Sequence, residues 1–170
     1  LNEDIGFDIT GTNVTVDFSA GVPLPGWKGS ADNVIEIDTL DKNIDWAFGI
    51  DGSHHVLRGF NVRGKVTTGA VVVYNVATDV TLDSMAFADV RGDAVRIRDE
   101  HTEGNRIIGT QCGWFGPVDT GGGLRPPEPV TGACVEVSRG AHDNLIGVPG
   151  AASNVFADAR FGVHLTGRGT

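Results

Sequence analysis

The sequence has little that would build helices, a basic surface or a membrane span. Its 170 residues include 25 Gly and 7 Pro, and no long apolar stripe recurs at helical spacing. Lys and Arg number 13 against 22 Asp and Glu, which gives a net charge of -9. That sign disfavours duplex nucleic acid and anionic membrane surfaces, and no run reaches the roughly 18 apolar residues of a bilayer span. We therefore expect no nucleic-acid partner and no membrane insertion.

The chain also lacks an initiating Met and a signal peptide. It opens at Leu1 within strand-like sequence and stops at Thr170 directly after a strand-like segment. We therefore expect a fragment or processed product of a longer protein, with its targeting segment removed.

Cysteine is scarce, and the only two, Cys112 and Cys134, flank the longest irregular stretch. They are either unrelated free thiols packed as small apolar residues or a disulfide that closes the loop between them. Closing a loop of about 20 residues would contribute roughly 3 kcal/mol and would imply an oxidising, exported environment. The second interpretation predicts a secreted or cell-surface protein.

What the chain has instead is a repeat of short apolar strands separated by turns. The repeated segments are Ser53–Gly64, Gly69–Asn75, Thr78–Phe87 and Gly92–Asp99. Val71 and Val73 map onto Val95 and Ile97 at an offset of 24 residues. A period in this range, built from three short strands, indicates a stacked solenoid.

Each coil is expected to hold an A, a B and a C strand. The expected A strands are Ala47–Asp51, Ala70–Asn75, Ala94–Asp99, Ala133–Ser138 and Gly162–Thr166. The B strands are expected near His55–Leu57, Val80–Leu82, Arg106–Ile108 and Asn144–Ile146, and the C strands near Phe60–Val62, Met85–Phe87, Cys112–Trp114 and Val155–Ala157. Period-2 alternation points the following residues inward: Val71, Val73, Val95, Ile97, Val135, Val137, Val163 and Leu165.

Residues 1–170 are expected to form a single domain, with regular coils at 46–170 and a long loop at 115–132. Residues 1–45 fit the period less well. Ile9–Phe18 is predicted to be one more B–C unit, and Val34–Asp38 is either a hairpin or part of an irregular first coil.

Phe48–Gly64 and Asn144–Phe156 resemble the right-handed parallel β-helix repeats of the pectin-lyase-like superfamily. The likeness covers about two thirds of the chain and implies an all-β, right-handed parallel β-helix with three strands and about 24 residues per coil. That superfamily includes polysaccharide lyases, glycoside hydrolases, epimerases, phage tailspikes and non-catalytic surface proteins. Function must therefore be argued from a site.

The alternation that buries the valines turns their neighbours outward in two columns. The first column is Gly49, Val72, Arg96, Glu136 and His164. The second column is Asp51, Tyr74, Arg98, Ser138 and Thr166. Because coils lie about 4.8 Å apart, we expect Arg96 to contact Glu136, and Tyr74 to lie beside Arg98.

In enzymes of the superfamily the equivalent face binds polysaccharide, so the resemblance implies a polysaccharide partner here. A guanidinium fork matches a carboxylate, which favours an acidic sugar. The expected substrate-binding residues are Arg96, Ser138, Trp114 and Arg125. The expected catalytic residues are Tyr74, Arg98, Glu136 and His164.

A lyase needs a base and an acid or charge stabiliser, whereas a hydrolase needs two carboxylates about 5–10 Å apart. Only Glu136 sits securely on the face, so a lyase or epimerase fits slightly better than a hydrolase. The simpler alternative is that Arg96 and Glu136 form a cross-strand ion pair contributing about 0.2–1 kcal/mol.

The rival function is a non-catalytic structural or adhesive module of a larger surface or fibre protein. Arg91–Asp93 reads Arg-Gly-Asp, like an adhesion tripeptide, at a position where a turn also needs Gly and Asp. Asp38, Asp41 and Asp45 could attract Ca²⁺, but no clear acidic cluster falls on the proposed face, so we expect no cofactor. Uncapped coils would permit end-to-end self-association or continuation into further coils.

Overall fold

The computed structural model describes residues 5–17, 36–38, 44–64, 66–113, 118–119, 124–125, 129–150 and 153–167. These residues form strands, turns and connecting segments. Among them there is no helix with the length and hydropathy of a membrane span. Trp114 lies outside the described residues, as does most of the predicted loop at 115–132.

Three parallel sheets make up the body of the molecule. Sheet A has the order β1-β4-β7-β10-β15-β18 and consists of β1 (Ile5–Ile9), β4 (Ile44–Ile50), β7 (Val66–Val73), β10 (Asp93–Arg98), β15 (Val130–Ser138) and β18 (Ala159–Thr166). Sheet B has the order β16-β11-β8-β5-β2 and consists of β2 (Thr15–Asp17), β5 (Val56–Arg58), β8 (Thr81–Asp83), β11 (Arg106–Ile108) and β16 (Leu145–Ile146). Sheet C has the order β17-β12-β9-β6-β3 and consists of β3 (Glu36–Asp38), β6 (Asn61–Arg63), β9 (Ala86–Ala88), β12 (Gln111–Cys112) and β17 (Val155–Phe156).

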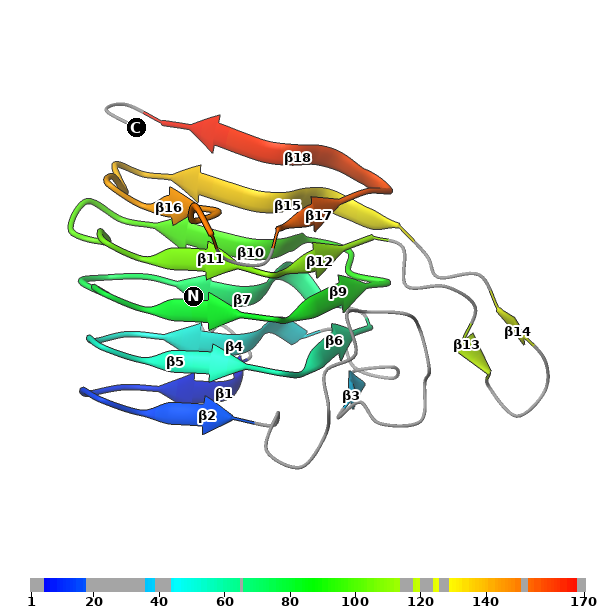
Figure 1. The fold of residues 1–170 in the computed structure, drawn as a ribbon, viewed down its shortest axis with the longest axis horizontal. Coiled ribbons are helices and arrows are strands. Elements are labelled where there is room, and N and C mark those ends of the chain that lie inside the picture. Colours follow the sequence, from blue (N-terminus) through cyan, green and yellow to red (C-terminus); the bar gives the residue numbers. More distant parts are fainter. Residues whose placement is uncertain are drawn as a thin grey trace.

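The chain passes through sheets A, B and C in turn and repeats that path up the stack, with β18 added to sheet A at the end (Figure 1). Each strand pairs in parallel with its counterparts in the neighbouring coils, as Val71 does with Val95 across β7 and β10. The predicted all-β architecture with parallel strands in stacked coils is therefore confirmed. The 24-residue offset read from Val71 and Val95 is also the observed register.

The inward-facing residues of sheet A form the predicted apolar ladders. Val71, Val95 and Val135 pair in succession, and each is 0% exposed. The prediction fails at the last strand, where Val163 is 44% and Leu165 61% exposed. Both occupy core positions of β18, which is the last strand of sheet A among the residues that the structure describes.

The simple alternation also fails near the start of the sheet A strands, where two consecutive residues face the core. Ala94 and Val95 both belong to the buried apolar cluster, as do Ala47 with Phe48. The residue before each such pair consequently turns outward and adds a third outer column. Its members are Trp46, Gly69, Asp93, Ala133 and Phe161.

The first coil is more complete than the sequence predicts. Ile9 ends β1 in sheet A, so the predicted B–C unit at Ile9–Phe18 is wrong at its start. Thr15–Asp17 forms β2 in sheet B and pairs with β5. Glu36–Asp38 forms β3 and pairs in parallel with β6, which makes it part of the first coil rather than a hairpin.

Cys112 in β12 and Cys134 in β15 form a disulfide, with Cα atoms 5.7 Å apart and both residues 1% exposed. Of the two interpretations offered by the sequence, the structure contains the cross-link. The segment it closes includes β13 (Val118–Asp119) and β14 (Leu124–Arg125), an antiparallel pair that Figure 1 shows away from the stack. The predicted loop ends earlier than expected, because β15 already begins at Val130.

Polar side chains hold the turns between sheets A and B at one repeated position. Asn105 Oδ1 accepts the Val80 N–H at 2.9 Å, and Asn144 Oδ1 accepts the Asn105 N–H at 3.0 Å. His55 fills the same position nearer the start, where its Nδ1 accepts the Val14 N–H at 3.1 Å. These bonds satisfy buried backbone donors between coils, which explains why polar residues occupy the interior there.

Candidate functional site

The outer face of sheet A is the surface on which the sequence places its candidate residues. Arg96 pairs with Glu136 and Glu136 with His164 in the strand register, so these three residues form one column across β10, β15 and β18. Arg98 and Ser138 pair in the next column. β10 and β15 each pair with a strand on both sides, whereas β18, which carries His164, pairs with β15 at the end of the described sheet.

A run of ionic contacts crosses three adjacent strands of this face. Arg96 Nε and Nη2 lie 2.9 and 2.7 Å from Asp93 Oδ2. Arg96 Nε also lies 3.3 Å from Glu136 Oε1, and Glu136 Oε2 lies 3.6 Å from His164 Nδ1. The expected contact between Arg96 and Glu136 is therefore present, and Asp93 extends it by one further carboxylate.

Asp93 was not among the candidates taken from the sequence. It is 4% exposed, and its Oδ1 accepts the Ala133 N–H at 2.7 Å. Burial raises the pKa of the Asp93 carboxyl, while the Ala133 N–H and the Arg96 guanidinium act in the opposite direction. The adhesion reading of Arg91–Asp93 loses its support, because the carboxylate is buried and engaged within sheet A. Period-2 alternation would place Asp93, three residues before Arg96, on the opposite face of the strand, so the sequence contains no signal for this contact.

An aromatic and cationic cluster occupies the neighbouring part of the face. The Arg98 guanidinium carbon lies 4.6 Å from the Trp46 ring centroid and 5.7 Å from that of Tyr74. The Trp46 and Tyr74 rings meet edge to face at 4.9 Å. Trp46 is 1% exposed and lies over Gly49, where a Cβ atom would come within 3.1 Å of the indole. The side chains of Trp46, Tyr74 and Arg98 therefore pack against one another and cover this part of the outer face.

Tyr74 is held as a phenol. Its hydroxyl donates to Asp8 Oδ1 at 3.3 Å, and burial together with the charges of Asp8 and Asp51 raises the pKa of Tyr74 to about 12, against an opposing effect of Arg98. A phenol with that pKa stays protonated at neutral pH, so it serves as a hydrogen-bond donor but is a weaker acid than an ordinary tyrosine and is not a base. Of the catalytic roles expected for Tyr74 from the sequence, that of a general base is therefore disfavoured.

The remaining candidates are placed as follows. Ser138 is 5% exposed on β15, between Arg98 and Thr166 in the register. Arg125 lies in β14, which pairs with β13. Trp114 lies outside the described residues.

Phe161 is another residue on this face that is not among the candidates named from the sequence, and the same is true of Trp46 and Asp8. Its ring stacks on His164 at 4.7 Å, and the Arg160 guanidinium lies 5.3 Å from the same ring. Phe161 is 40% exposed at the C-terminal end of sheet A. The outer face therefore ends in a partly exposed group of His, Phe and Arg.

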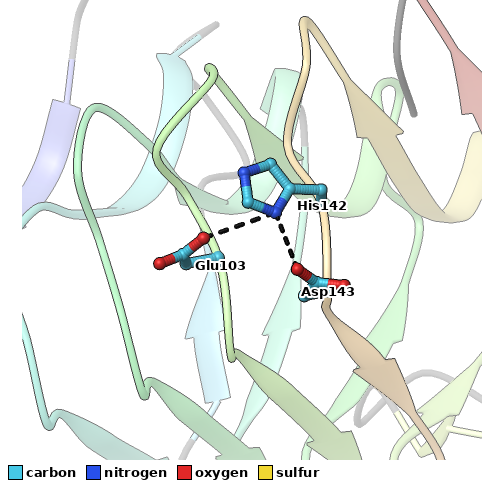
Figure 2. A group of neighbouring side chains, drawn as sticks. All are labelled: Glu103, His142 and Asp143. Carbon is cyan, nitrogen blue, oxygen red and sulfur yellow. Dashed lines mark hydrogen bonds and ion pairs between the residues drawn. The ribbon is translucent and has the colours of Figure 1, made fainter.

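A separate cluster lies on the turns between sheets A and B (Figure 2). His142 Nδ1 is 3.3 Å from Glu103 Oε2 and 3.0 Å from Asp143 Oδ2. Among the described residues these three form the group with metal-ligand geometry, their donor atoms lying within 4.8 Å of one another. Two carboxylates and an imidazole on exposed turns fall short of the six to eight oxygens that Ca²⁺ takes. Of the acidic residues suggested for Ca²⁺, Asp45 accepts the Thr67 hydroxyl at 2.9 Å, and Asp41 lies outside the described residues.

Comparison of the chain with models of protein families, with curated proteins and with solved structures returned no match. The function is therefore inferred from the geometry of this face.

Proposed function

We propose that the chain is a secreted or cell-surface β-helix domain, right-handed as in the pectin-lyase-like superfamily, that binds an acidic polysaccharide along the outer face of sheet A. Parallel strands joined by crossovers in one sheet are right-handed in about 98% of cases, which supports the handedness. The disulfide between Cys112 and Cys134 supports an oxidising compartment.

The observation that carries the proposal is the run Asp93–Arg96–Glu136–His164 across adjacent strands. The Arg96 side chain is 25% exposed, and its Nε and Nη2 contact the carboxylates of Asp93 and Glu136. A guanidinium has five N–H donors, so Arg96 retains donors for a carboxylate of a sugar. His164, with a side chain 39% exposed, offers a second polar contact two strands away.

Cleavage of the bound chain is the further part of the proposal. An elimination needs a base for the proton beside the sugar carboxylate and an acid for the leaving oxygen. His164 is the candidate base. Tyr74 lies three strands from His164 in sheet A, roughly 14 Å at the usual strand spacing, so its hydroxyl would not reach the leaving oxygen of the same sugar. The candidate charge stabiliser for that oxygen is instead Arg96, which contacts the same Glu136 carboxylate as His164. This arrangement fits a lyase better than a hydrolase or an epimerase. Arg98 and Glu136 then serve as charged groups around the reacting sugar.

One observation favours the alternative, a non-catalytic structural or adhesive module. Arg96 already contacts two carboxylates of its own chain, and Arg98 Nε lies 3.6 Å from Asp99 Oδ2. Arginines that are already paired with carboxylates of the same chain attract a polyanion less strongly. In this alternative the residues of the face stabilise the stacking of the coils.

Binding to immobilised polygalacturonate, alginate and a neutral glucan tests the proposal. Arg96→Gln removes the charge and is expected to reduce retention on the acidic polymers at least tenfold. Arg106→Gln is the matched control, because Arg106 is exposed on β11 in sheet B. Equal retention of the two variants, or no retention of the unaltered protein on either acidic polymer, would exclude this face as the binding surface.

Turnover is followed separately by the ultraviolet absorbance of the unsaturated sugar that a lyase leaves. Loss of this signal in His164→Gln with retained binding supports elimination. Binding without any product in the unaltered protein assigns the domain to the non-catalytic class.

A further inference from the structure

Within the described part of the chain, the strand at each end of sheet A pairs on one side only and carries exposed apolar side chains. β1 lies at one end of the stack and β18 at the other (Figure 1). Phe7 in β1 is 54% exposed, and Val163 and Leu165 in β18 are 44% and 61% exposed. Their counterparts inside the stack are buried, as Phe48 is at 3%. Both ends therefore expose core positions of the same sheet.

The two ends also match in register. Phe7 pairs with Phe48, whose column runs through Val71 to Val163. Asp8 heads the column that ends at His164. A copy of β1 placed above β18 in this register would set Phe7 on Val163, and the carboxylate of Asp8 beside the imidazole of His164.

The backbone edges are complementary as well. Within sheet A the Asp51 N–H donates to Ile9 O at 2.9 Å, and the Tyr74 N–H donates to Ile50 O at 3.1 Å. Each bond runs from an outward residue to the carbonyl of an inward residue one strand nearer β1. The same pattern across two copies lets the Asp8 N–H donate to Val163 O. An uncovered sheet edge is a template for pairing with another chain.

We propose that copies of this chain associate head to tail, with β1 of one copy pairing in parallel with β18 of the next. The apolar match of Phe7 with Val163 and the charge match of Asp8 with His164 select a second copy as the partner. Because the two surfaces differ, the contact leaves a free end on each side and generates an open series rather than a closed dimer. Sheets B and C have five strands against six in sheet A, so the contact runs through sheet A alone and is weak.

Sedimentation velocity of variants blocked at one end tests the direction of the contact. Phe7→Lys places an ammonium group in the β1 surface, and Leu165→Lys does so in the β18 surface. Val76→Lys is the matched control, since Val76 is 57% exposed on a turn between β7 and β8 rather than at an end. Circular dichroism of each variant verifies that the sheets are intact.

The unaltered protein and Val76→Lys should show sedimentation coefficients that grow with concentration beyond the dimer. Each end-blocked variant alone should stay monomeric, and their equimolar mixture should stop at a dimer. A monomeric unaltered protein at the highest soluble concentration would overturn the proposal. Association of Phe7→Lys alone would do so too, because it would show β18 pairing with β18, and association of Leu165→Lys alone would show the same of β1.

Discussion

Arg98 stacks its guanidinium on the ring of Trp46, 4.6 Å from the centroid, although the two residues lie two strands apart in sheet A. The indole reaches across Gly49, and Gly69 pairs with Trp46 on the intervening strand β7. Two residues without side chains thus leave the room in which a tryptophan and an arginine cover the outer face. The contact also explains why Trp46, though outside the apolar core cluster, is 1% exposed.

The stack predicts that Arg98→Lys lowers the free energy of unfolding by about 1 kcal/mol, because an ammonium loses the planar contact with the indole. Urea denaturation followed by Trp fluorescence measures the change. Arg106→Lys, on the exposed surface of β11, should leave the midpoint unchanged. Equal midpoints for both variants would show that the stack adds nothing to stability.

Tyr74 provides a clean spectroscopic test, since it is the single Tyr of the chain. Its tyrosinate absorbance should titrate with a midpoint near the pKa of about 12 rather than near the ordinary value of about 10. Because the folded-state pKa is the higher one, this stabilising contribution is complete below about pH 10 and is lost as the pH rises toward 12. Asp8→Asn should move the midpoint downward, since it removes one charge that opposes ionisation. A midpoint near 10 in the native protein would contradict the buried, hydrogen-bonded phenol.

The stacking of coils was predictable because it depends on a spacing that the sequence displays. Val71 and Val95 sit 24 residues apart and pair in the structure, and the same offset brings outward neighbours into columns. The contact of Arg96 with Glu136 follows from the same logic, even though 40 residues separate them, because the expected strands bracket the long loop.

Three features could not be predicted from alternation alone. Two consecutive inward residues, such as Ala94 and Val95, reverse the parity of a strand and move Asp93 to the outer face. The strands of the first coil are only partly assigned from the sequence, because its B and C strands, β2 and β3, lie far apart along the chain. Leu165 has the pattern of a core residue, but burial needs a coil above it, which local sequence does not report.

Removing the disulfide should destabilise the folded protein, because the unfolded chain without the cross-link has more conformational entropy. The cross-link joins residues 22 positions apart, so the double variant Cys112→Ala with Cys134→Ala should lose about 3 kcal/mol of unfolding free energy. Both cysteines are 1% exposed, so reductant should act slowly on the native protein and quickly in urea. Equal urea midpoints for the oxidised protein and the double variant would contradict a constraining cross-link.

Asn105 is expected to be the most sensitive polar residue between coils. Its side chain accepts the Val80 N–H at 2.9 Å and donates to Ala77 O at 3.1 Å, both within the buried turn. Asn105→Leu leaves these groups without partners at about 1–3 kcal/mol each, so a total loss of about 3 kcal/mol is expected. Asn105→His should lose less, because His55 already serves the equivalent N–H of Val14 through a ring nitrogen. Urea midpoints rank the two variants, and a leucine variant as stable as the histidine variant would show that these bonds do not hold the coils in register.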